Sequence, residues 1–182
     1  MKKWVRAKAL WIGVIALILV GSLSFWGSPP SGAKATEGVK WYAYEEGARK
    51  AREGDRPIVL HFYTDWCTWC EKMDKETFAN PRIQEFLKLS FIPIKINAES
   101  REMIKVEGKE TKMADLARKF GVRGFPTTVF LESNGTTIGS VPGYIDQDRM
   151  RKILVYVHEK AYKKMDFEEF TRQRSEFRAT GH

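Results

Sequence analysis

The two cysteines of this chain, Cys67 and Cys70, are separated by two residues at a point where a predicted strand passes into a predicted helix. The run 57–64 is a nearly continuous series of β-prone residues, as expected of a central strand covered on both faces. The run 67–78 contains neither Gly nor Pro and is helical in composition. This junction constrains the fold strongly, because it places both sulfurs at the start of a helix that leaves a buried strand.

Helices and strands are predicted to alternate over the rest of the chain. Strand–helix–strand crossovers followed by a terminal hairpin predict an α/β fold of three layers, a mixed central sheet with helices on both faces. Residues 99–111 are polar and form an excursion without a clear assignment. Further helices are expected over 41–54, 81–89, 112–120, 145–164 and 167–177, and further strands over 90–98, 125–132 and 136–144, with a hairpin turn at Asn134-Gly135.

The first 35 residues have the layout of a targeting segment. A basic start is followed by an apolar run of about 18 residues (9–26), and Ala33-Lys34-Ala35 puts small residues where a signal peptidase cuts. The run is also near the lower limit for crossing a bilayer, so a signal peptide cleaved after Ala35 and an uncleaved membrane anchor both remain open. In either case we expect the folded domain outside the cytoplasm, in the periplasm or an equivalent space, secreted or anchored to the inner membrane.

The positive charge of the chain is partly a property of this segment. The net charge is +8, and residues 1–35 hold five basic residues and no acid, so 8 − 5 leaves +3 for the remainder. Beyond residue 36, Lys and Arg are interleaved with Asp and Glu, which is typical of a solvated surface. We therefore expect no nucleic-acid partner, because nucleic-acid binding requires basic residues gathered on one element.

Thiol chemistry follows from the position of the cysteine pair. The start of a helix stabilises an anion, which favours the thiolate of Cys67, and thiolate is the attacking species. Cys70 lies one turn later on the same face, where its thiol can attack a mixed disulfide formed through Cys67. We therefore assign Cys67 as the nucleophile and Cys70 as the resolving thiol.

Other uses of two cysteines fit less well. A tetrahedral zinc site needs four ligands, and outside the pair the chain offers three scattered histidines and no second cysteine pair. Haem attachment needs His directly after the second cysteine, and residue 71 is Glu. A purely structural disulfide would close a tiny loop and constrain little of the unfolded chain. We expect redox chemistry at Cys67 and Cys70, with no metal and no cofactor.

Two stretches resemble the thioredoxin superfamily, 58–70 (IVLHFYTDWCTWC) and 121–131 (GVRGFPTTVFL). The resemblance covers about residues 40–160 and implies the thioredoxin-like form of the three-layer fold. It also implies that Pro126 is cis and lies beside the cysteine pair, and that the backbone of Phe125 pairs with a substrate chain. Without the cysteine motif, Pro126 would be interpreted as an ordinary proline at the start of a strand.

The stretch DWCTWCEKMDKETF and the helix start at Asn80-Pro81 are similar to a subgroup, the exported thioredoxin-like proteins and the C-terminal thioredoxin domain of the transmembrane reductase DsbD. The domain organisation predicted on this basis has three parts. Residues 1–35 are the signal peptide or anchor, 36–164 the thioredoxin-like domain, and 165–182 a helical tail.

The chain departs from the family pattern at two positions. Trp69 replaces the proline that usually precedes the second cysteine, and His61 replaces a buried Asp thought to relay a proton to the resolving cysteine. His61 would either relay that proton, with a pKa nearer neutrality, or be a core histidine with satisfied hydrogen bonds. Together with Tyr63, Trp66 and Trp69 either form an apolar collar where a partner peptide docks or pack against the first helix.

The leading hypothesis for the function is an exported thiol-disulfide oxidoreductase acting on protein substrates, in the reducing direction that the resemblance implies. Its partners would be cysteine-containing proteins and an upstream electron donor, with membrane contact only through an uncleaved N-terminus, and we expect a monomer. The alternative hypothesis is a binding module of the same fold that holds a partner protein or a metal without redox turnover.

Overall fold

The structure, a computed structural model, describes residues 38–179, with side chains up to residue 177, so the targeting segment predicted over 1–35 lies outside the described residues. The strands are β1 (Ile58–Tyr63), β2 (Ile92–Asn97), β3 (Met103–Val106), β4 (Lys109–Lys112), β5 (Thr127–Leu131) and β6 (Thr137–Pro142). The helices are α1 (Tyr44–Gly54), α2 (Thr68–Met73), α3 (Pro81–Ser90), α4 (Met113–Lys119), α5 (Gln147–His158) and α6 (Phe167–Ala179), with a π-helical turn η1 (Asp74–Phe78) and a 3-10 turn η2 (Ala161–Lys163).

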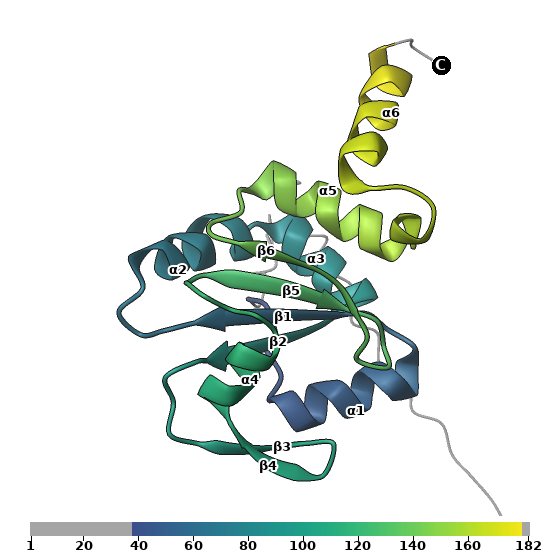
Figure 1. Ribbon diagram of the computed structural model, residues 1–182. Helices are drawn as coiled ribbons and strands as arrows, with labels where there is room; N and C mark the ends of the chain where they lie inside the picture. Colours follow the sequence, from purple (N-terminus) through teal and green to yellow (C-terminus); the bar gives the residue numbers. More distant parts are fainter. Residues whose placement is uncertain (1–37, 180–182) are drawn as a thin grey trace, which may run out of the picture. The chain divides into compact units, whose positions relative to one another are not determined.

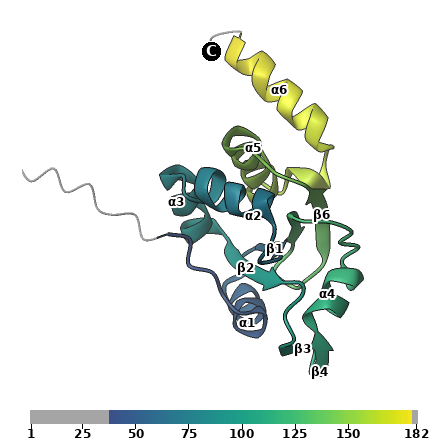
Figure 2. The ribbon, with the colours of Figure 1, turned by 90° about the vertical axis from the view of Figure 1, so that its left-hand side faces the viewer.

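Four strands form a mixed sheet in the order β2-β1-β5-β6 (Figure 1). β1 runs parallel to β2 and antiparallel to β5, and β5 runs antiparallel to β6. Helices α1 and α4 cover one face, whereas α2, α3 and α5 cover the other, as two views at right angles show (Figures 1 and 2). The predicted three-layer α/β fold with a mixed sheet is therefore confirmed.

The alternation of side chains along β1 separates the core into two layers. Ile58, Leu60 and Phe62 pack with α1 and α4, whereas Val59 packs with α2, α3 and α5. Both sets are fully or almost fully buried, because a central strand is covered on both faces. The same alternation turns His61 toward the layer of Val59, which is the layer that contains the helix following the cysteines.

Local signals placed several element boundaries correctly. The Asn80 side chain accepts hydrogen bonds from the backbone N–H groups of Arg82 and Ile83, at 3.0 and 3.3 Å, so it caps α3 with Pro81 at the first helical position. Asp166 accepts a hydrogen bond from the N–H of Glu169 at 2.8 Å at the start of α6. The helix start at Asn80-Pro81 was predicted from the sequence.

Other boundaries differ from the predictions. The predicted first helix begins at residue 44 instead of 41, because Tyr42 pairs with the edge of β2 and its N–H donates to the carbonyl of Pro93. The helix predicted over 67–78 ends as α2 at residue 73 and continues as the π-helical turn η1. The helix predicted over 145–164 is interrupted at Lys160, whose φ of 53° lies in the left-handed region.

The polar excursion forms the hairpin β3–β4, which turns at Glu107 and Gly108 with φ of 52° and 80°. Two consecutive positive φ angles are typical of a tight hairpin turn, and Gly adopts one of them without strain. The hairpin contacts α1, since the Glu45 carboxylate accepts a hydrogen bond from the N–H of Lys105 at 2.6 Å. It therefore lies on the side of the sheet that α1 and α4 cover (Figure 2).

The C-terminal helix α6 projects away from the sheet beyond α5 (Figures 1 and 2), and a few of its side chains contact α5 or the residue that follows it. The ring of Tyr156 on α5 lies 5.5 Å from Phe167 and 5.2 Å from Phe170, and Arg174 forms an ion pair with Glu159. These contacts attach the predicted tail to the last helix of the domain.

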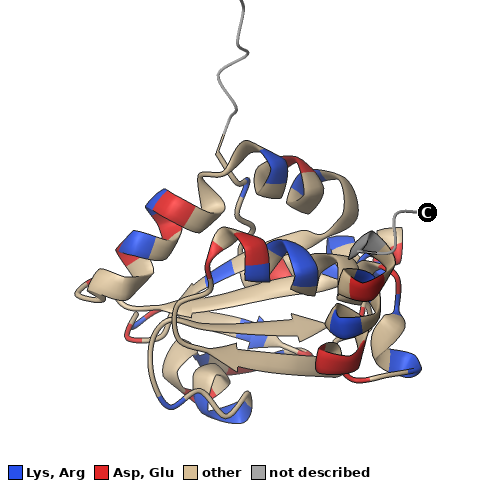
Figure 3. Cartoon of the chain, turned by 90° about the horizontal axis from the view of Figure 1, so that it is seen from above, with Lys and Arg blue, Asp and Glu red and all other residues tan. Residues whose placement is uncertain are grey.

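Acidic and basic residues alternate along the helices in the view from above (Figure 3). Several of them form ion pairs one helical turn apart, such as Arg49–Glu53 and Lys75–Glu71. Exposed pairs of this kind contribute little to stability. Within residues 38–179, no helix is both long enough and apolar enough to cross a bilayer.

Candidate active site

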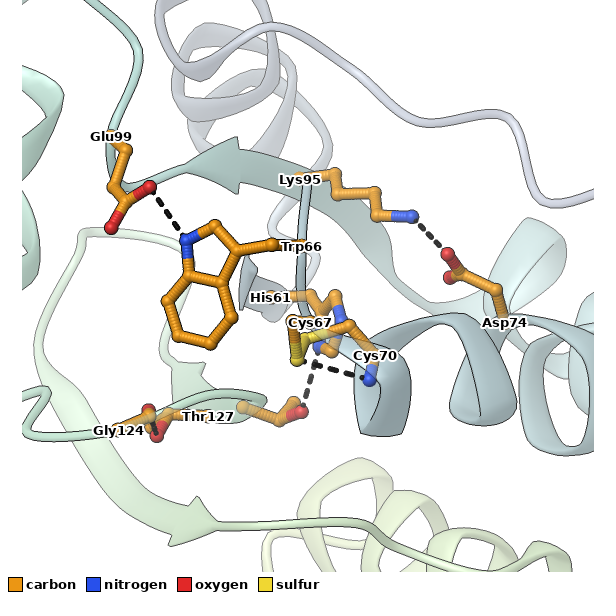
Figure 4. The surroundings of a disulfide bond; sticks show 10 residues. His61, Trp66, Cys67, Cys70, Asp74, Lys95, Glu99, Gly124 and Thr127 are labelled. Atoms are coloured by element: carbon orange, nitrogen blue, oxygen red, sulfur yellow. Dashed lines mark hydrogen bonds and ion pairs between the residues drawn. A yellow bond between two sulfur atoms is a disulfide. The ribbon is translucent and has the colours of Figure 1, made fainter. Parts of the chain in front are cut away.

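Cys67 and Cys70 lie where β1 ends and α2 begins, as the sequence predicts (Figure 4). They form a disulfide with an S–S distance of 2.06 Å and a Cα–Cα distance of 5.2 Å. Cys67 is the N-cap residue of α2, and its Sγ accepts a hydrogen bond from the backbone N–H of Cys70 at 3.1 Å. The same N–H is available to a Cys67 thiolate, because hydrogen bonds to the charged form favour it.

The two cysteines differ in exposure. Cys67 is 7% exposed and Cys70 is 2% exposed, so an incoming sulfur reaches Cys67 more easily. This asymmetry agrees with the roles assigned from the sequence, in which Cys67 attacks and Cys70 resolves.

A second loop, at the start of β5, contributes to the site. The Phe125–Pro126 peptide bond is cis, and Pro126 is buried. The hydroxyl of Thr127 donates to the carbonyl of Gly124 at 2.7 Å, which closes the loop (Figure 4). The ring of Phe125 lies 6.4 Å from that of Trp66, the neighbour of Cys67, so the loop and the cysteine pair belong to one site.

Both tryptophans of the motif are exposed, Trp66 by 68% and Trp69 by 56%. The indole N–H of Trp66 donates to the Glu99 carboxylate at 2.8 Å, which fixes the ring beside the disulfide (Figure 4). Trp69 lies 5.9 Å from the ring of Tyr144. Neither ring is buried against the first helix, so their positions agree with the collar interpretation. Exposed large aromatic side chains around a reactive group are typical of a binding surface.

His61 lies on β1 beneath the cysteines and is fully buried (Figure 4). Its Nδ1 forms a hydrogen bond of 3.1 Å with the Thr128 hydroxyl, and its Nε2 has no hydrogen-bond partner among the described residues. Burial, and secondarily the charge of Lys95, lowers the pKa of His61 to about 3. The expectation of a pKa nearer neutrality is therefore wrong, because desolvation disfavours the charged imidazole. At physiological pH His61 is neutral.

An ion pair whose lysine acts on this histidine joins β2 to η1. Lys95 forms an ion pair with Asp74 at 2.6 Å, and its Nζ lies 4.7 Å from the centre of the Tyr63 ring. Lys95 is less exposed than the other bridging lysines, with 19% of its side chain accessible. Burial raises the pKa of Tyr63, and the neighbouring carboxylate of Asp65 raises it further. The ammonium of Lys95 is thus held close to the buried histidine by a compensating carboxylate.

Several residues of the site were not singled out in the sequence, because their contacts join distant segments. Glu99 meets Trp66 across 33 residues, and Thr128 meets His61 across 67. No sequence signal identifies either pair. The described residues include no group of three or more His, Cys, Asp or Glu side chains placed to hold a metal ion.

Comparisons with known proteins agree with this geometry. A family model of thioredoxin-like domains matches residues 44–158, well over half of the chain. This chain belongs to the thioredoxin-like family. The thiol:disulfide interchange protein DsbD of Photorhabdus laumondii is 27% identical over 163 residues, covering 85% of this chain and 26% of that protein. The chain thus spans about a quarter of the length of the DsbD relatives that it matches.

Solved structures show the same fold. A thioredoxin-fold protein from Helicobacter pylori has a TM-score of 0.55 and 22% identity, covering 66% of this chain and 80% of that one. A thioredoxin from Thermus thermophilus also has a TM-score of 0.55, with 24% identity and coverage of 66% and 87%. Family membership, the cysteine pair and its position in the fold together give this site the chemistry of a protein-disulfide oxidoreductase.

Proposed function

We propose that the chain reduces disulfides in protein substrates. In the first step the Cys67 thiolate attacks one sulfur of the substrate disulfide, and the other substrate sulfur leaves as a thiolate that takes up a proton. In the second step the Cys70 thiolate attacks the Sγ of Cys67 and releases the second substrate sulfur. Two electrons pass from the protein dithiol to the substrate, and the protein is left with the Cys67–Cys70 disulfide.

The observation that carries this proposal is the position of the disulfide between the end of β1 and the start of α2. The more exposed cysteine comes first in the chain, and two exposed tryptophans lie beside the pair. In this proposal Trp66, Trp69 and the cis loop at Phe125–Pro126 hold an extended substrate segment. The Cys70 thiol must ionise before it attacks, and His61, with a pKa of about 3, is too weak a base to accept its proton.

The reducing direction, the location and the partners are part of the same proposal. The DsbD relatives support exchange with cysteine-containing partner proteins, and an upstream donor must supply electrons after each turnover. The segment 1–35 supports an exported domain, released by cleavage after Ala35 or held by an anchor. Residues 36–164 form the catalytic domain in this organisation, and 165–182 its C-terminal tail.

Trapping tests the exchange directly. A Cys70→Ser variant keeps the attacking sulfur but lacks the resolving one, so it should accumulate mixed disulfides with partner proteins that dithiothreitol releases. Cys67→Ser is the matched control, and we expect few adducts, since the remaining sulfur is the more deeply buried. Equal trapping by both variants would show that the two roles are assigned wrongly.

The direction is tested by the reduction potential of the full chain, equilibrated in thiol–disulfide buffers. We expect a value near that of thioredoxin, about −270 mV, and a value near about −120 mV, typical of strong oxidants, would overturn the reducing role. A binding module without turnover makes a different prediction. In that case a double Cys67→Ser, Cys70→Ser variant would retain partner binding and the cellular phenotype.

A further inference from the structure

Trp69 belongs to a cluster of side chains with Lys72, Glu76 and Tyr144, and Tyr144 is distant from the others in the sequence. The ring of Tyr144 lies 5.9 Å from the Trp69 ring, and the Nζ of Lys72 lies 5.2 Å from the Trp69 centroid and 5.4 Å from the Tyr144 centroid. The hydroxyl of Tyr144 donates to the Glu76 carboxylate at 2.7 Å, and Lys72 lies 3.9 Å from the same carboxylate. Trp69 is thus held by a tilted aromatic ring and a cation, and more than half of it is exposed.

The cluster joins the two halves of the site. The segment after Tyr144 is tied to η1, because Thr77 donates to the carbonyl of Ile145 at 2.6 Å. The residue before Tyr144 is tied to the cis loop, because the N–H of Gly143 donates to the carbonyl of Pro126 at 2.8 Å. Tyr144 therefore sets where the Trp69 ring lies relative to the loop that the proposed substrate contacts.

Charge decides which side chains suit the exposed part of the indole. Lys72 already interacts with the electron-rich rings, so a second cation on Trp69 would be repelled by its ammonium and would compete for the same ring. The acid of this cluster, Glu76, already binds both Lys72 and Tyr144. An aromatic or aliphatic side chain is not repelled by Lys72 and does not compete with it as a cation for the ring. It gains free energy by covering the exposed part of the Trp69 ring.

We propose that Trp69, Tyr144 and Lys72 form a selectivity wall, which favours substrate segments with an aromatic or aliphatic residue beside the reactive cysteine and disfavours Lys or Arg at that position. Trp69 contacts the substrate residue, Tyr144 positions the indole, and Lys72 supplies the discrimination against cations. This inference rests on the proposed function and defines its substrate class more closely.

The test compares two disulfide-linked peptide dimers, identical except for Phe or Lys directly before the cysteine. The reduced full chain is mixed with each peptide, and the second-order rate constant of peptide reduction is measured by chromatography after acid quenching. The uncharged 2-hydroxyethyl disulfide is measured in parallel, since it has no side chain to contact the wall. We expect the Phe peptide to react about 3- to 10-fold faster than the Lys peptide, in line with the size of aromatic and cation–ring contacts.

Three variants locate the effect. Trp69→Ala should slow the reduction of the Phe peptide, so that the ratio of the Phe to the Lys rate constant falls to less than about 2. Lys72→Met should lower the ratio by speeding the Lys peptide about 3-fold. Tyr144→Phe keeps the ring but removes the bond to Glu76, and should lower the ratio by a smaller factor of about 2.

Matched control variants separate the effect of the selectivity wall from the effects of net charge and of losing a tyrosine hydroxyl elsewhere. Lys75→Met removes one positive charge, as Lys72→Met does, but one helical turn away at a lysine that pairs with Glu71. It should leave the Phe-to-Lys rate ratio unchanged. Tyr162→Phe removes a tyrosine hydroxyl that bonds to Glu132, outside the wall, and should also leave it unchanged. A ratio between two peptides is insensitive to a uniform loss of active protein.

The outcomes distinguish the two proposals. If the wild-type chain reduces neither the peptides nor 2-hydroxyethyl disulfide, the proposed function fails. If it reduces the small disulfide and both peptides, but the ratio is near 1 or is unaltered in Trp69→Ala and Lys72→Met, the selectivity wall is refuted and the function stands. A ratio that falls equally in Lys75→Met would assign the effect to net charge and would also refute the wall.

Discussion

Replacing His61 by Leu is expected to remove a large part of the acid sensitivity of the folded domain. In the folded chain burial, with a smaller contribution from Lys95, lowers the pKa of His61 to about 3, whereas an unfolded histidine titrates near 6.5. Below pH 6.5 the unfolded chain therefore binds a proton that the folded chain does not bind until about pH 3. The stability that this group provides is present above pH 6.5 and is lost as the pH falls.

The magnitude follows from the two pKa values. Between pH 7.5 and 5.0 an unfolded histidine goes from about one tenth protonated to almost fully protonated, which lowers the free energy of unfolding by about 2 kcal/mol. His158 and His182 are present in both proteins, so the difference between wild type and His61→Leu isolates His61. Leu is a compact apolar replacement for a ring that lies among Trp41 and Phe78.

The assay is urea denaturation followed by far-ultraviolet circular dichroism, on the full chain with the same mild nonionic detergent at every pH. Wild type should lose about 2 kcal/mol more than His61→Leu between pH 7.5 and 5.0. A difference below about 0.5 kcal/mol would refute the reasoning, because His61 would then titrate alike in both states. If the variant does not fold, the ring proton shifts of wild-type His61 decide, and they should stay at the neutral position down to about pH 4.

Three further substitutions test the contacts around the site by the same denaturation assay. Thr128→Val removes the hydrogen-bond partner of His61 in the core and should cost about 1–3 kcal/mol, and a neutral result would contradict that bond. Asn80→Ala removes the cap of α3 and should cost about 1 kcal/mol, whereas unchanged stability would show that the cap is dispensable. Gly47→Ala should destabilise by about 1–3 kcal/mol despite the higher helix propensity of Ala, because the added Cβ would lie 2.5 Å from the Cγ1 of Ile94, and a stabilised variant would contradict this packing.

The features of this protein that could be predicted from sequence are those whose causes lie within a few residues. The junction of strand and helix at Cys67, the caps at Asn80 and Asp166, and the strand and helix periodicities all depend on neighbours along the chain. The mixed sheet followed from the order of elements, since crossovers and hairpins permit few arrangements. The same local reasoning left residues 99–111 unassigned, because the hairpin there is largely polar and is held partly by Glu45, distant in sequence.

By itself the sequence determined that two sulfurs stand at the start of a helix, and it predicted that the first attacks and the second resolves. Only the tertiary structure decided the surroundings of that pair. Thr128 meets His61 because β5 pairs antiparallel with β1 in the register that sets these two residues opposite each other. Tyr144 meets Glu76 across 68 residues for a similar reason, since the loop after β6 returns to η1. Burial and pairing across a sheet depend on which segments become neighbours in space, and local propensity does not encode that choice.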